Sequence, residues 1–181
     1  MIYLTLNQIT TAKAFAYAHR NKMKNPNDRR SEKDIIQDTF IGQLAELTFH
    51  TENKDLISIT LPNQDEAESD KRGYDLGDFI QTSNLAETYR IGIKGIDSMH
   101  KNLFIPEEID DKVYILYYIN EKLGTCQCLG ALLITPEIRK GLKESRGLTK
   151  DAGYSKYKVL LSELDKDVTN ILLKLQNDEK N

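Results

Sequence analysis

The 181-residue sequence has no tryptophan and only two cysteines, Cys126 and Cys128. Two cysteines are too few for a disulfide framework. A structural zinc site would need two further ligands, whereas His19, His50 and His100 are scattered singly along the chain. Because alternate residues of a strand share a face, we expect the two thiols to lie on the same face of one strand, buried and reduced.

Several patterns that would assign other functions are also missing. No apolar run approaches the roughly 20 residues of a membrane-spanning helix, and the N-terminal residues lack a basic leader followed by an apolar core. The chain has no Gly-x-Ser-x-Gly nucleophile elbow, and Gly147, Thr149 and Lys150 do not follow the spacing of a phosphate-binding P-loop. We therefore expect a cytoplasmic protein with no membrane partner, and a serine hydrolase finds no support.

The overall composition is that of an ordinary globular protein, with 39% hydrophobic and 29% charged residues. A chain of this length can bury a hydrophobic core without disulfides or metals. No internal repeat or low-complexity tract divides it. We therefore expect one domain over residues 1–176 and a frayed tail over residues 177–181.

The sequence also lacks a strong excess of positive charge, since its formal net charge is −3. The basic residues are nevertheless concentrated in two segments, 11–33 with seven basic and two acidic residues, and 137–158 with seven basic and three acidic residues. Such segments suit contacts with a phosphate backbone, but they also suit a soluble protein with uneven surface charge. The candidate nucleic-acid-binding residues are Arg20, Lys22, Lys24, Arg29, Arg30, Arg146, Lys150 and Lys156.

Hydrophobic periodicity predicts an α+β fold, in which a central mixed, mostly antiparallel five-stranded sheet is flanked by helices. The connecting segments 98–111 and 141–158 are expected to contain no strand. The expected helices cover residues 6–23, 31–49 and 135–142 and a last segment that opens at Ser162, and the expected strands cover residues 56–61, 73–80, 89–95, 112–120 and 126–135.

The central hairpin of this expected sheet brings together residues that could do chemistry. In the strand over 89–95, Ile91 and Ile93 would face the core and Lys94 would face the other way. Antiparallel pairing with the strand over 73–80 can bring Asp75 near Lys94. Gly42, inside an otherwise good helix, suggests that another segment approaches the helix backbone closely there.

Three short motifs follow one another along the chain: Gly42, Gln43, Ala45 and Glu46, then Gly73, Tyr74 and Asp75, then Ile91, Ile93 and Lys94. In this order they resemble the motifs of the PD-(D/E)xK nuclease superfamily, which includes restriction endonucleases, phage nucleases and DNA-repair nucleases. The resemblance covers roughly residues 31–142 and implies a restriction-endonuclease-like fold. The sequence departs from the family pattern at Gly92, where the family has an acid two residues before its lysine.

The resemblance implies a catalytic site made of Glu46, Asp75 and Lys94. Mg²⁺ or Mn²⁺ would be held by the carboxylates of Asp75 and Glu46 and the backbone carbonyl of Ile93, with open positions left for water and a DNA phosphate. Lys94 would add positive charge at the scissile phosphate. The accessory candidates are Gln43 and Asp78.

Two alternatives remain open at this point. Taken singly, the three residues also fit structural roles: Glu46 as a helix-surface carboxylate, Asp75 as an acid at a strand end, and Lys94 as a charge on an edge strand. Gly92 would also suit a catalytically inactive member of the same fold that binds DNA or a protein. A symmetric cut through both strands of a duplex would favour a two-fold dimer.

Overall fold

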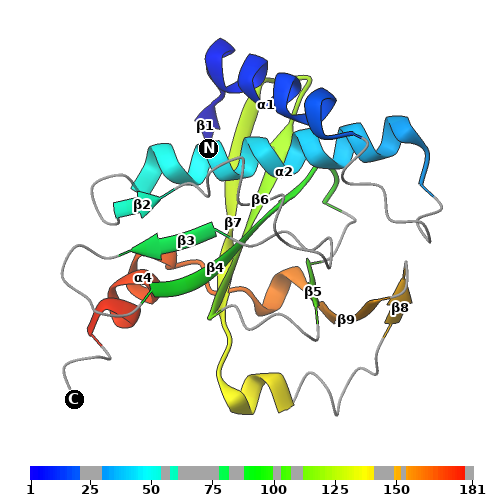
Figure 1. Cartoon of the computed structure of the whole chain (residues 1–181). Helices are drawn as coiled ribbons and strands as arrows, with labels where there is room; N and C mark the ends of the chain where they lie inside the picture. The colour runs from blue at the N-terminus through cyan, green and yellow to red at the C-terminus, as the bar shows by residue number, and fades with distance from the viewer. Residues whose placement is uncertain are drawn as a thin grey trace.

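The computed structural model describes residues 1–20, 30–53, 58–60, 78–81, 88–99, 103–106, 112–140, 149–151 and 154–177. Within these residues the protein has a mixed α+β architecture, with one mixed sheet flanked by helices and a second, smaller sheet (Figure 1). Among these residues, no helix combines the length and the apolar character needed to cross a bilayer.

The main sheet has six strands in the described part of the chain, in the order β1-β7-β6-β4-β3-β2. Its neighbours are antiparallel except for β4 and β6, which are parallel, so the expectation of a mixed and mostly antiparallel sheet is confirmed. The expected number of five strands is wrong, because the N-terminal residues add a short edge strand. The six strands are β1 (Ile2–Tyr3), β2 (Ser58–Thr60), β3 (Asp78–Gln81), β4 (Thr88–Ile96), β6 (Val113–Asn120) and β7 (Thr125–Leu133).

Helices α1 (Leu6–His19) and α2 (Glu32–Asn53) lie together over one face of this sheet (Figure 1). Thr5 begins α1 with a capping box, in which its hydroxyl accepts from the amide of Gln8. Ser31 begins α2 in the same way: its hydroxyl accepts from the amide of Asp34, and the Asp34 carboxylate accepts from the amide of Ser31. These reciprocal bonds satisfy amides that the first turn of a helix leaves open.

Alternation along the central strands divides the apolar side chains between two cores, one on each face of the main sheet. In β6, Val113, Ile115 and Tyr117 belong to the core under the helices, whereas Tyr114 and Leu116 belong to the opposite core. All five are almost completely buried. This confirms the expectation that the strand over residues 112–120 is covered on both faces.

The second core is covered by a three-stranded sheet in the order β5-β9-β8, and this sheet corrects the prediction that residues 98–111 and 141–158 are strandless connectors. Leu103, Ile105 and Val159 of this sheet are buried in the second core. The apolar alternation in these strands is short and β9 is rich in lysine, so the sequence pattern resembles that of a connecting segment. The strands are β5 (Leu103–Pro106), β8 (Thr149–Asp151) and β9 (Tyr154–Val159).

The C-terminal helix α4 (Val168–Asn177) begins six residues later than the expected start at Ser162, after a short 3-10 turn over Leu161–Glu163. A bulge in β7 ties this segment to the sheet. Gly130 has a φ of +132°, and a Cβ atom there would lie 2.5 Å from the carbonyl oxygen of Asp165. Glycine therefore permits Ala131 and Asp165 to exchange two backbone hydrogen bonds of 2.8 Å.

Candidate functional site

The hairpin of β3 and β4 is the element on which the expected site depends. Asp78 is paired with Ile91, Phe79 with Arg90, and the antiparallel register is regular from there to Gln81 and Thr88. Ile91 and Ile93 are buried in the core under α2, as the alternation predicts. Asp75 lies outside the described residues.

Lys94 lies on the face of the main sheet that is turned away from α2. Its neighbours along the strand fix this direction: Ile93 belongs to the core under α2, and Ile96, which has the same parity as Lys94, belongs to the opposite core. The Lys94 side chain is half-buried, and its partner in the parallel strand is Leu116. Lys94 therefore shares its face with the second sheet.

Glu46 and Gln43 are half-buried residues of α2, which packs on the other face. The main sheet thus separates the side of Glu46 from the side of Lys94, and no ion pair joins the two among the described residues. Ile93 is a buried strand residue paired with Ile115, and Asp78 is paired with buried Ile91. The structure therefore does not bring Glu46 to Lys94.

The close backbone approach expected at Gly42 occurs elsewhere. Among the described residues, no atom outside the surrounding helix backbone lies within 4 Å of the place where a Gly42 Cβ would be, so these residues show no close approach there. A Cβ on Gly95 would lie 2.5 Å from the carbonyl oxygen of Ile41. The glycine that lets α2 contact the sheet is therefore in the strand, directly after Lys94.

The described basic candidates differ in their surroundings. Arg20 is paired with Glu32 at 3.3 Å, and Arg30 is paired with Asp38 at 2.8 Å. These acids offset part of the charge that would attract a phosphate. Lys150 and Lys156 lie on β8 and β9. Lys22, Lys24, Arg29 and Arg146 lie outside the described residues.

A buried polar group at the C-terminal end of α2 was not expected from the sequence. The Tyr117 hydroxyl donates to Oε2 of Glu52 at 2.7 Å, and burial raises the pKa of this phenol. Burial also raises the pKa of the Cys126 thiol to about 11 and raises the pKa of Cys128, so both thiols are poor nucleophiles. Both cysteines are free, with Cys126 buried and Cys128 half-buried.

His50, four residues after Glu46, should make stability depend on pH. Burial lowers the pKa of His50 below its ordinary value of 6.5. The unfolded chain then binds more protons than the folded one below about pH 6.5, so the free energy of unfolding should fall as the pH falls through this range. Denaturant unfolding of wild type and His50→Gln at neutral and mildly acidic pH measures the effect. Equal pH dependence in the two proteins would contradict it.

The described residues define a mixed α+β protein whose β3–β4 hairpin presents a half-buried lysine on one face of the sheet. They contain no group of three or more histidine, cysteine or acidic residues arranged to hold a metal ion. Comparison with family models, curated proteins and solved structures returned no match to this chain.

Proposed function

We propose that this protein is a cytoplasmic, magnesium-dependent DNA endonuclease with a restriction-endonuclease-like fold, in which Asp75 and Lys94 form the core of the site. The observation that carries the proposal is the hairpin register. Between Asp78 and Gln81, each step forward along β3 is matched by one step back along β4 from Ile91. If the pairing predicted from the sequence extends to residues 75–77, which lie outside the described residues, the same register would set Asp75 opposite Lys94. Residues directly opposite in an antiparallel pair share a face.

The chemistry follows from these two groups. Mg²⁺ retains several waters and is commonly held by one or two carboxylates together with substrate phosphates. The Asp75 carboxylate and the backbone carbonyl of Ile93 would supply the ligands that the protein contributes to the metal. The metal would lower the pKa of a bound water and polarise the phosphate, and the Lys94 ammonium would stabilise the negative charge that develops there. Glu46 is left out of this assignment because α2 covers the other face.

The direct test is incubation of the purified protein with supercoiled plasmid, with Mg²⁺ or Mn²⁺ and with EDTA. We expect nicked and linear DNA only when the metal is present. A site that binds the metal should also raise the melting temperature, since a ligand at one hundred times its Kd adds about 2.7 kcal/mol to the free energy of unfolding. Intact plasmid at all metal concentrations would contradict the proposal. A two-fold dimer would let two copies cut both strands of a duplex.

Gly92 favours one second candidate, a catalytically inactive protein of the same fold that binds DNA or a protein. Gly92 is buried, and its partner in β6 is fully buried Tyr114, so the position that would carry the second acid is enclosed and offers no carboxylate. The same experiments separate the candidates. DNA binding without cleavage, together with a melting temperature that does not respond to Mg²⁺, would favour the inactive protein.

A further inference from the structure

The outward face of the second sheet carries an exposed aromatic ring beside a lysine. In β5, Leu103 and Ile105 are buried, and Phe104 between them is 41% exposed. In β9, Val159 is buried and Lys158 before it is exposed. Phe104 and Lys158 are direct partners in the antiparallel ladder, so their side chains leave the sheet next to each other on the same face.

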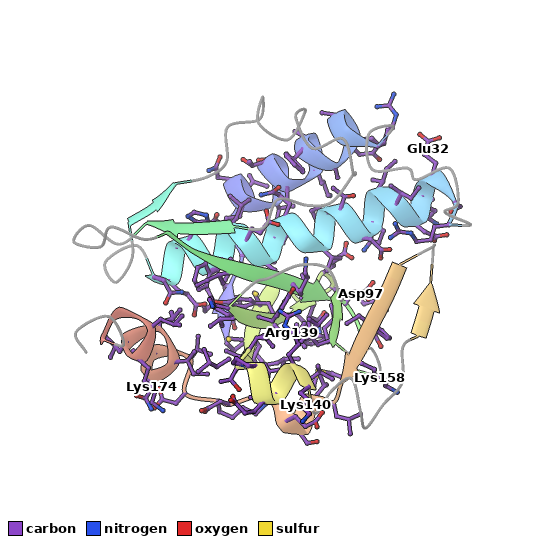
Figure 2. All side chains as sticks on the ribbon, turned by 60° about the horizontal axis from the view of Figure 1, so that its bottom comes forward. Glu32, Asp97, Arg139, Lys140, Lys158 and Lys174 are labelled. Atoms are coloured by element: carbon purple, nitrogen blue, oxygen red, sulfur yellow. The ribbon has the colours of Figure 1, made fainter. Side chains whose placement is uncertain are left out.

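One more lysine shares the parity of Lys158, because Lys156 occupies the next such position in β9, opposite Pro106 of β5. Figure 2 shows Lys158 and Lys140 on one side of the molecule, well apart from Lys174 of α4. A negatively charged partner is therefore the one that this face complements.

This face also lies on the proposed site's side of the main sheet. The second sheet contributes Leu103, Ile105 and Val159 to the core that contains Ile96, and Lys94 has the same parity in β4 as Ile96. Phe104 and Lys94 therefore lie on the same side of the main sheet, and the second sheet separates the outer Phe104–Lys158 face from the core beneath it.

We propose that the Phe104–Lys158 face binds single-stranded nucleic acid, with one base stacked on Phe104 and a neighbouring phosphate near Lys158. Bases of a single strand expose their flat faces and can stack on an aromatic ring, whereas in a duplex these faces are covered by neighbouring base pairs. The inference rests on the nucleic-acid function proposed above and adds to it a subsite for single-stranded DNA or RNA, or for a single-stranded part of a branched DNA.

Binding is measured by fluorescence anisotropy with labelled oligothymidylate, labelled oligouridylate and a labelled duplex, in EDTA so that cleavage cannot occur. Phe104→Ala should weaken single-strand binding roughly five- to a hundredfold and change duplex binding little. Phe104→Tyr keeps a ring and should restore most of the affinity. Lys158→Ala should weaken binding and reduce the slope of log affinity against log salt by about 1. A preference for either oligonucleotide identifies the sugar that is recognised.

Matched controls come from the other surfaces of the protein. Tyr17→Ala removes an aromatic side chain that is 57% exposed on α1, and Lys174→Ala removes an exposed lysine on α4. Both should bind as wild type. Unchanged single-strand binding by Phe104→Ala, or an equal loss on single strand and duplex, overturns the inference. A wild-type protein that binds oligothymidylate through Phe104 but does not cut plasmid leaves this inference standing and removes the proposed catalysis.

Discussion

Replacing Lys94 by alanine should reduce metal-dependent DNA cleavage by about two to three orders of magnitude while leaving the fold intact. A preorganised positive group at a scissile phosphate stabilises charge that develops only in the transition state, and removing one such group typically costs this much in rate. The cost in stability should be small, because Lys94 is half-buried and has no ion-pair partner among the described residues. Plasmid nicking rates and melting temperatures measure the two effects separately.

Glu46→Gln is the matched control, since it removes a charge from α2 without changing the size of the side chain. The main sheet lies between α2 and the face of Lys94, so Glu46→Gln should cleave at roughly the wild-type rate. Equal losses in both variants would show that the carboxylate and the amine act on one metal site and would contradict the separation by the sheet. Wild-type cleavage by Lys94→Ala would end the nuclease assignment itself.

The sequence predicts the main sheet well where its pattern is long. The nearly continuous apolar run of β6 and the alternation of Ile91, Ile93 and Lys94 in β4 were both sufficient to place the strands and their buried sides. The reciprocal bonds of Ser31 and Asp34 could also be predicted, because a helix cap is a contact between residues three apart.

Contacts between distant segments were harder to predict. A glycine in a helix signals a close approach only if another backbone is near, and here the contact is made by Gly95 of β4 rather than by Gly42. The second sheet depends on three short strands, two of them separated from β5 by more than 40 residues, and short alternations carry little signal alone. The position of Glu46 could have been inferred: if the apolar stripe of α2 packs on Ile91 and Ile93, then Lys94 must point away from that helix.

Gly95→Ala should destabilise the protein more than other single methyl additions at the interface of α2 and the main sheet. The added Cβ would lie 2.5 Å from the carbonyl oxygen of Ile41 and 2.9 Å from its carbonyl carbon, and both atoms belong to helix backbone that cannot rotate away. Overpacking of this kind costs about 1 to 3 kcal/mol, and for a chain of this size each kcal/mol lowers the melting temperature by roughly 2 to 4 °C. Thermal unfolding followed by circular dichroism measures the shift.

Gly42→Ala is the matched control on α2, one residue after Ile41 but directed away from the sheet. A Cβ there meets nothing within 4 Å among the described residues, and alanine is favoured over glycine inside a helix by about 1 kcal/mol, so this variant should melt a few degrees above wild type. Opposite shifts for the two alanines would establish that the strand, and not the helix, supplies the space in which α2 meets the sheet beside Lys94. A Gly95→Ala protein as stable as wild type would show that the backbones are not in contact.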